Sequence, residues 1–587
     1  MTVEVFGRLS VGDRARTIDI LNERLSPTDL RNLADALDKP KKRGKARKTV
    51  EQLVLEAGRE QGVRGRPPTK LPVEDLAAYI VDRHGISLLE EAEVRRCLVG
   101  KASGAQRDLL NSYAGADKVR GRSSEIVRGI AARKWHAGKS WARYFVRILE
   151  LPAALAGLPG SSQEPAELEV EPFVPLNDLA DFQLDLKGQA VEVLDAGPGE
   201  NRAVLTLPTG AGKTRTAVES LVSWLLGQSG DPVLLWIAQS EELCEQAVQA
   251  FRDVWIDLGH RFNVRSSLKI ARFWGSTDVP EMPVNVVVAS IQKVHAVVRN
   301  LDSEERAELV ELARQIGAVV VDEAHRIGAP SYKEVLRFLN IDVSKDGRSE
   351  VPLLGLTATP YRKDDQETEG MSRMFHGRLL SAASLGQYPI KELRSRGVLS
   401  SVEHEILSSG EWFDMERDKK FREHYDQFHD FHTGFLQEIS ESKARNKELY
   451  NRLMEIPETW PTLFFGCTVE HAEAMSILLR RAGRSAEVIT GETRAATRRA
   501  LIEEFREGNI SVLCNFGVLT TGFDAPKVRA LVVGRPTSSR VLYAQMIGRG
   551  MRGKAFGGTE SCLVVDVQDN IRFQGELAYN KYAEFYR

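Results

Sequence analysis

The hydrophobic pattern of the chain changes character near residue 155. In residues 1–155, apolar positions recur every three or four residues, as in Ile18-Leu21-Leu25 and Val127-Ile130. This spacing places apolar side chains on one face of a helix, so the segment is predicted to be mostly α-helical. The sequence LPAALAGLPGSSQEPAELEVEPFVP, which starts at Leu151, is rich in Pro, Gly and Glu. That composition predicts a linker, which we place at 156–176.

Beyond the linker, short runs that are apolar throughout alternate with helical stretches. Such runs predict strands buried on both faces, as in a parallel sheet covered by helices. The fold prediction is therefore α/β, with two tandem parallel-sheet domains after the helical one. The more polar stretch 363–460 between them predicts helices, with a helical insertion at about 410–450. One series of runs comprises 203–207, 233–238, 284–290, 317–323 and 353–359, and the other 462–467, 486–490, 511–516, 530–534 and 562–567.

Composition excludes several classes of protein. Hydrophobic residues make up 42% and charged residues 28% of the 587 residues, which is typical of a globular chain and not of a disordered one. No apolar run approaches the roughly 18 residues of a membrane span, and the N-terminus lacks the apolar core of a signal peptide. The five cysteines are scattered and never form a CxxC pair, which favours reduced thiols in a cytoplasmic protein.

The formal net charge of −2 hides an uneven distribution. Residues 1–150 hold 30 Lys and Arg against 20 Asp and Glu, a surplus of +10, whereas the remainder carries 50 against 62. A basic domain joined to an acidic body suggests a polyanionic partner for the first part. A solvated basic surface is the alternative.

A phosphate-binding loop is the first candidate site. Leu207-Pro208-Thr209-Gly210-Ala211-Gly212-Lys213-Thr214 follows a predicted strand and opens a predicted helix. Glycines let backbone N–H groups close around phosphate oxygens, and the helix N-terminus favours negative charge. Lys213 is predicted to reach the β- and γ-phosphates of ATP, and Thr214 to bind Mg²⁺. The strict pattern has Gly where this chain has Leu207.

Two acidic residues end another predicted strand. Asp322 and Glu323 follow Val319-Val320-Val321, and His325 completes the sequence DEAH, with Asp322 standing 109 residues after Lys213. An acid at a strand end can hold Mg²⁺, and its neighbour can activate water. We predict that Asp322 coordinates the metal and that Glu323 is the general base.

Further short motifs follow in order along the chain. They are Asp181-Phe182-Gln183, Trp236-Ile237-Ala238, Ser290-Ile291-Gln292, Thr357-Ala358-Thr359-Pro360, Gly466-Cys467-Thr468, Leu519-Thr520-Thr521-Gly522-Phe523-Asp524 and Gln545-Met546-Ile547-Gly548-Arg549-Gly550-Met551-Arg552. The whole series resembles the motifs of superfamily 2 helicases, DEAD/DEAH-type ATPases with two RecA-like domains. The resemblance covers about residues 177–570. It implies that 177–380 is RecA-like domain 1, which binds ATP, and that 381–587 is RecA-like domain 2.

The resemblance also implies roles for single residues. The ATP-binding set is Gln183 at the adenine, Thr209, Gly210, Gly212, Lys213, Thr214, Gly522 and Asp524, and Gln545, Arg549 and Arg552 join the catalytic set. The residues implied to contact nucleic acid are Gln239, Ser290, Gln292, Thr468 and Thr520, although hydroxyls at strand ends often only cap helices. His325, Thr357 and Thr359 are implied to couple the ATP state to domain movement.

Arg549 and Arg552 also have a chemical rationale. Charge that develops on a transferred phosphoryl group needs cationic donors, and Arg offers a planar fork that stays charged. These arginines lie in the second predicted domain, whereas Lys213 and Glu323 lie in the first. The site is therefore expected to be complete only when the cleft between the domains closes.

The choice of polymer follows from the resemblance alone. The sequences LGLTATPYR and RPTSSRVLYAQMIGRGMR resemble duplex-DNA-directed members, including the RadD, UvsW and XPB repair helicases and the motor subunits of type I and type III restriction enzymes. This implies a nucleic-acid-stimulated ATPase that works as a DNA helicase or translocase in repair, restriction or anti-phage defence. An RNA helicase and an ATP-gated sensor that recruits an effector are the alternatives.

Two features of the N-terminal region are typical of nucleic-acid binding. The run KPKKRGKARK (39–48), between two short helical patterns, resembles a SAP-type DNA-binding hairpin, or is a solvated loop. Between Arg120 and Arg147, cations interleave with Trp135, Trp141 and Tyr144. These aromatics could stack on bases or form the buried side of an amphipathic helix. The region could equally dock a partner protein.

A group of histidines is a further candidate for a metal site. His424, His429 and His432 lie close together in FREHYDQFHDFHTGF, but aromatic residues at helical spacing favour a packed face there. The sequence carries no nuclease signature, so any nuclease activity is expected to come from a partner.

Overall fold

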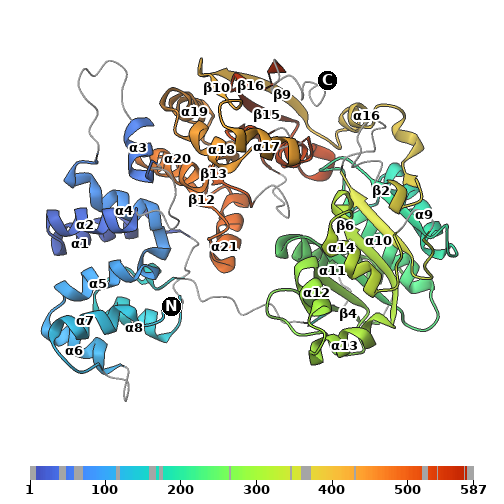
Figure 1. Cartoon of the computed structure of the whole chain (residues 1–587), viewed down its shortest axis with the longest axis horizontal. Helices are drawn as coiled ribbons and strands as arrows, with labels where there is room; N and C mark the ends of the chain where they lie inside the picture. The colour runs from blue at the N-terminus through green and yellow to red at the C-terminus, as the bar shows by residue number, and fades with distance from the viewer. Residues whose placement is uncertain are drawn as a thin grey trace.

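The structure of the chain is a computed structural model (Figure 1). It describes residues 8–38, 48–57, 70–113, 119–157, 167–170, 176–262, 266–343, 347–358, 372–428, 431–518, 527–537, 540–573 and 576–577. Three bodies follow one another along the chain: an N-terminal accessory domain, domain 1 and domain 2. Among the described residues, no helix combines the length and the apolar character needed to cross a bilayer.

The accessory domain is helical, as the apolar spacing predicted. Helix α2 (Pro27–Leu37) starts where the sequence supplies a cap: Ser26 accepts a hydrogen bond from the Asp29 backbone N–H, Asp29 accepts one in return, and Pro27 occupies the first helical position. A single apolar core joins all of its helices. They are α1 (Val11–Arg24), α2 (Pro27–Leu37), α3 (Val50–Ala57), α4 (Leu76–His84), α5 (Ala92–Lys101), α6 (Gly104–Ser112), α7 (Ser123–Ala132) and α8 (Ser140–Ile148), with 3₁₀ turns η1 (Val73–Asp75), η2 (Gly85–Glu90) and η4 (Ala153–Ala156).

Domain 1 is built on an eight-stranded sheet in the described part of the chain, in the order β1-β4-β5-β3-β6-β7-β2-β8. All neighbours are parallel except β1 and β4. Every run of the first predicted series forms one of these strands. The strands are β1 (Glu167–Val170), β2 (Arg202–Thr206), β3 (Val233–Ala238), β4 (Leu268–Phe273), β5 (Val286–Ser290), β6 (Ile316–Asp322), β7 (Leu353–Thr357) and β8 (Leu379–Leu380).

Helices cover both faces of this sheet because its strands are apolar on both faces. Along β3, Leu234 and Trp236 join one apolar core, while Leu235 and Ile237 join the core on the other side. This alternation is the two-residue period of a strand. One face is covered by α9 (Asp181–Asp195), α10 (Lys213–Gly227) and α11 (Glu241–Phe262), and the other by α12 (Ile291–Arg299), α13 (Glu304–Ala313) and α14 (Pro330–Phe338).

Domain 2 repeats the plan with a fully parallel sheet ordered β12-β13-β11-β14-β15-β9 in the described residues. The second predicted series supplies five of its strands, and a small sheet β10-β16-β17 adjoins it. The strands are β9 (Ser401–Ser408), β10 (Phe413–Asp414), β11 (Thr462–Phe465), β12 (Ala486–Ile489), β13 (Val512–Asn515), β14 (Ala530–Val533), β15 (Ser561–Gln568), β16 (Ile571–Phe573) and β17 (Glu576–Leu577). The helices are α16 (Pro389–Ser395), α17 (Lys419–Phe428), α18 (Thr433–Ser440), α19 (Lys443–Glu455), α20 (Val469–Arg481), α21 (Ala495–Arg506) and α22 (Arg540–Ile547).

Several strands lie where the sequence predicted none, among them β1, β4 and β9. The linker segment contributes β1, which pairs with β4 at the edge of the first sheet. The polar stretch 363–460 contributes β9, which pairs with β15 along eight residues. Because β9 is an edge strand, half of its side chains face water and its sequence lacks a continuous apolar run.

The domains share apolar contacts. One apolar core extends from Leu207 and Ala211 of domain 1 to Leu399 and Met551 of domain 2. The accessory domain packs separately against α20 of domain 2, whose Ile477 and Leu478 belong to the accessory core. The first of these contacts positions the site described next.

Candidate ATP site between two domains

The turn from β2 to α10 has the backbone of a phosphate-binding loop. Gly210 and Gly212 have φ angles of 90° and 83°, in the left-handed region that glycine adopts without strain. A Cβ atom on Gly212 would stand 2.4 Å from the Gln183 amide nitrogen. Leu207, in place of the expected glycine, is buried in the apolar core and anchors the start of the turn.

Gln183 lies directly against this loop. Its amide nitrogen donates to the Ala211 carbonyl at 3.2 Å, and its amide oxygen accepts from the Ala180 N–H at 3.0 Å. The side chain therefore joins the start of α9 to the loop. The adenine contact implied for Gln183 stays a proposal.

Parallel strand order brings the acidic pair to the same sheet edge as the loop. β2, β7 and β6 are neighbours, so the carboxyl ends of β2 and β6 lie two strands apart. The Lys213 amine lies 3.9 Å from a Glu323 carboxylate oxygen, and His325 lies 3.3 Å from the other oxygen. Glu323 has a φ of 53°, an uncommon conformation for a residue with a side chain, and its N–H donates to Asp322 at 2.9 Å.

Burial and charge act differently on the two acids. Burial raises the pKa of Asp322 above its usual range, although the Lys213 charge opposes the shift. Burial would also raise the pKa of Glu323, but Lys213, then His325 and Arg549, outweigh it and hold that pKa below the usual range. Glu323 is therefore ionised at neutral pH, the state that can accept a proton.

Domain 2 closes over the loop from the other side. A Cβ atom on Gly548 would stand 2.4 Å from the Thr209 side chain, and one on Gly210 would stand 3.5 Å from the Arg552 backbone nitrogen. The charge of Arg549 acts on Glu323 across the domain boundary. On α22, the Gln545 amide nitrogen is buried and has no hydrogen-bond partner among the described residues.

Two residues at this boundary were missed by sequence reasoning. The Phe556 ring would lie 3.4 Å from a Cβ on Gly212, and Leu399 would lie 3.3 Å from one on Gly210. No pattern in the sequence marks either residue, because each approaches the loop only when the two domains meet.

The residues implied to couple ATP to movement lie at the same edge. His325 pairs with Glu323 as described, and the buried Thr357 ends β7. The Thr357 carbonyl accepts a hydrogen bond from the Leu207 N–H at 3.4 Å, which ties β7 to the first residue of the loop. Thr359 lies outside the described residues, as do Thr520, Gly522 and Asp524.

The described residues implied to contact nucleic acid have structural partners of their own. Ser290 caps α12 by accepting from the Lys293 N–H, and Thr468 caps α20 by accepting from the His471 N–H. Gln292 donates to the Gln239 carbonyl at 2.8 Å. Both hydroxyls thus serve as caps, the alternative left open by the sequence.

Other candidate features find structural roles. Trp135 and Trp141 are buried in the accessory core, so the packed-face interpretation of that segment holds. His432 caps α18 and stacks on Phe421, and no group of three or more His, Cys, Asp or Glu in the described residues could hold a metal ion. His429 and the basic run 39–47 lie outside the described residues.

Two tandem parallel-sheet domains with a phosphate-binding loop, an acidic strand end and arginines on the facing domain define the helicase-type P-loop ATPases. Residues 177–362 match the family "Type III restriction enzyme, res subunit", and residues 445–554 match "Helicase conserved C-terminal domain". The chain belongs to helicase superfamily 2, a class of ATP-dependent enzymes.

Similar proteins have been named in several organisms. The putative ATP-dependent helicase IRC3 of Saccharomyces cerevisiae is 24% identical over 396 residues, 66% of this chain and 51% of the relative. The type I restriction enzyme EcoKI endonuclease subunit of Escherichia coli is 26% identical over 60% of this chain and 31% of its own length. The DNA 3'-5' helicase XPB of Mycobacterium tuberculosis is 24% identical over 63% and 58%. The chain spans about half the length of the first of these relatives.

The chain was also compared with solved structures. The fragment structure of a putative HsdR subunit of a type I restriction enzyme from Vibrio vulnificus superposes with a TM-score of 0.43 and 20% identity, over 68% of this chain and 64% of that one. S. cerevisiae Dbp5 bound to RNA superposes with a TM-score of 0.44 and 16% identity, over 68% and 87%.

Proposed function

We propose that this chain hydrolyses ATP to move on or remodel DNA. The observation that carries the proposal is the meeting of charges from two domains at one carboxylate: Lys213 of domain 1 and Arg549 of domain 2 both act on Glu323. A site divided in this way is complete only when the domains are together, so hydrolysis can alternate with domain movement.

Each residue of the site has a distinct part in this proposal. Lys213 and the loop N–H groups bind the phosphates, and Arg549 and Arg552 stabilise charge that develops on the transferred phosphoryl group. Glu323 accepts a proton from the attacking water. A phosphate at the loop competes with Glu323 for Lys213, which makes the carboxylate a better base when the substrate is bound.

The donor set also fits Mg²⁺. Asp322 places a buried carboxylate at the strand end, and Thr214 lies in the first turn of α10. Carboxylate and hydroxyl oxygens are ligands that Mg²⁺ prefers. When bound, the metal supplies neutralising charge to the phosphates.

DNA is the proposed polymer, with repair, restriction or anti-phage defence as the setting. The names of the XPB and EcoKI relatives support this choice. We also propose that an effector or nuclease is supplied by a partner protein, because the sequence carries no nuclease signature. The cytoplasm is the proposed compartment, supported by five free cysteines.

The test is steady-state ATP hydrolysis with Mg²⁺ in the presence of single-stranded, duplex or forked DNA, or RNA. We expect stimulation by DNA, and no turnover in Glu323→Gln, which keeps the side-chain size and loses the base. Lys213→Ala is expected to abolish turnover as well. Stimulation by RNA alone would show that RNA and not DNA is the polymer. Wild-type turnover in Lys213→Ala would show that the assignment of the ATP site is wrong.

A further inference from the structure

The end of the accessory domain formed by α6, α7 and α8 is strongly basic. Residues 101–150 contain 11 Lys and Arg against 4 Asp and Glu. Lys139, Arg143 and Arg147 recur every four residues and are all exposed. Lys139 is the N-cap residue of α8, so at a rise of about 1.5 Å per residue these three form a row about 12 Å long along the helix. We call them the α8 row.

The cations of the α8 row differ in their partners from those elsewhere in the accessory domain. Among the described residues, no member of the row forms an ion pair or a side-chain hydrogen bond. Most cations among the described residues of 8–84, by contrast, are paired with acids. Examples are Arg14 with Asp82, Arg31 with Glu51, Lys48 with Glu56, and Lys70 with Asp35. The row therefore presents charge that no neighbouring acid of the described chain neutralises.

Packing beneath the row fixes its orientation. Trp141 and Phe145 of α8 are buried in the accessory core, and the Arg133 guanidinium lies 4.9 Å from the Trp141 ring. Because these aromatics are buried, they offer no surface on which a base could stack. What the helix presents outward is cationic, which suits the phosphates of a nucleic-acid backbone and reads no sequence.

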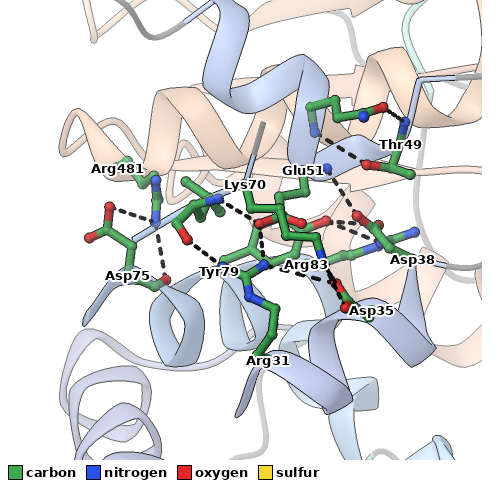
Figure 2. A network of polar contacts seen from close by, with 12 residues as sticks. Arg31, Asp35, Asp38, Thr49, Glu51, Lys70, Asp75, Tyr79, Arg83 and Arg481 are labelled. Atoms are coloured by element: carbon green, nitrogen blue, oxygen red, sulfur yellow. Dashed lines mark hydrogen bonds and ion pairs between the residues drawn. The ribbon is translucent and has the colours of Figure 1, made fainter. Parts of the chain in front are cut away.

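The accessory domain that carries the row is fixed to domain 2. Helix α20 is apolar on opposite sides: Ile477 and Leu478 join the accessory core, whereas Met475 and Leu479 join the core of domain 2. Polar contacts border this interface. Figure 2 shows Arg481 reaching from α20 to Asp75, whose carbonyl lies 3.2 Å from the guanidinium.

Further ion pairs lie along the same interface. Arg83 of α4 lies 3.5 Å from Glu473, and Glu90 lies 2.7 Å from Arg494 at the start of α21. Within the accessory domain, Arg31, Asp38, Glu51 and Tyr79 form the polar cluster of Figure 2, which joins α2, α3 and α4 to one another. In Figure 1, α6, α7 and α8 lie at the opposite end of the accessory domain from α3 and α20.

We propose that the α8 row is a second binding site for nucleic-acid backbone phosphates, carried by domain 2. The role of this site in the ATP cycle rests on the proposed function. A backbone held on α8 moves with domain 2 when domain 1 approaches or withdraws, so the row gives the motor a contact outside its two sheet domains.

The test is equilibrium binding of duplex DNA to the full chain, without ATP, across a salt series. Arg143→Ala/Arg147→Ala is compared with Lys333→Ala/Arg337→Ala on α14. That control removes two exposed cations with the same spacing, and they too lack ion pairs among the described residues. We expect the α8 variant to bind at least about tenfold more weakly near 0.1 M salt, with a salt slope smaller by about 2, and the α14 variant to match wild type.

A third variant separates charge from folding. Arg143→Lys/Arg147→Lys keeps both charges and is expected to restore most of the salt slope. Unchanged affinity and slope in the alanine variant would overturn the proposal and leave an acidic protein as the candidate ligand of the row. If DNA fails to stimulate wild-type ATP turnover while the α8 variant still loses its slope, the proposed function fails and the second site stands.

Discussion

At the scale of residues, the approach of Gly548 to Thr209 leaves no room for a side chain between the two domains. Gly548→Ala places a Cβ atom 2.4 Å from Thr209, so the domains cannot close fully. We expect ATP turnover to fall by about 100-fold because catalytic groups are displaced, while the affinity of the loop for nucleotide changes little. Turnover and fluorescent-nucleotide binding are the two measurements.

Gly188→Ala is the matched control. Gly188 lies in α9, and nothing stands within 4 Å of a Cβ atom built on it. The substitution is expected to keep full turnover and to stabilise the protein by about 0.5–1 kcal/mol, since alanine favours the helix. Equal loss of turnover in both variants would contradict the contact.

His471 predicts how stability depends on pH. Burial, with a smaller effect of the Arg445 charge, lowers the pKa of His471 from 6.5 to about 3. The folded chain keeps His471 neutral, so its contribution is intact above pH 6.5 and declines as the pH falls from 6.5 toward 3. The slope is at most about 1.4 kcal/mol per pH unit.

His471→Asn is expected to flatten that slope. The asparagine oxygen can accept the Cys467 N–H bond that the His471 ring nitrogen accepts now, and it does not titrate. Denaturant unfolding between pH 5 and 7 measures the difference, and parallel stability curves for the two proteins would refute the assignment.

At the scale of elements, α20 contributes to two apolar cores. Leu478 belongs to the accessory core and its neighbour Leu479 to the core of domain 2. Leu479→Ala is expected to lower the free energy of unfolding of domain 2 by about 2–5 kcal/mol, with faster hydrogen exchange in β11 and β13. Leu478→Ala is expected to speed exchange in α3 and α4 instead. Hydrogen exchange with mass spectrometry distinguishes the two, and identical patterns would show that α20 belongs to one core.

The elements also show what the sequence could predict. The strands β3 and β6 and the loop before α10 were predictable because their signals are consecutive residues: continuous apolar runs, and glycines before Lys213. The edge strands β1 and β9 gave no such signal, since their pairing partners are distant in sequence. Helix α20 did carry a signal that was missed, since Ile477, Leu478 and Leu479 place apolar side chains on opposite sides, a pattern of a helix buried all round.

The residues of the candidate ATP site also differ in whether the sequence could predict them. Lys213, Asp322 and Glu323 could be predicted because each lies in a short motif of consecutive residues, and the structure adds the parallel strand order that places both motifs at one sheet edge. Phe556 and Leu399 could not be predicted, because their proximity to the loop depends on the docking of two domains. The roles of Gln239, Ser290, Gln292 and Thr468 remain predictions.

At the scale of the whole molecule, the accessory domain and domain 2 are expected to move as one body. Fluorescent labels on α1 and α19 should keep their separation when an ATP analogue and DNA are added, whereas labels on α1 and α13 should change theirs. Single-molecule energy transfer measures both. If the distance between α1 and α19 changed while the distance between α1 and α13 stayed constant, the accessory domain would not be attached to domain 2.

The measurement that tests the central proposal most directly is the displacement of a third DNA strand from a duplex by the full chain. We predict displacement with ATP and Mg²⁺, none with a non-hydrolysable analogue, and none with Glu323→Gln. DNA-stimulated hydrolysis without any displacement would contradict a motor and would instead support a sensor that uses ATP to open and close.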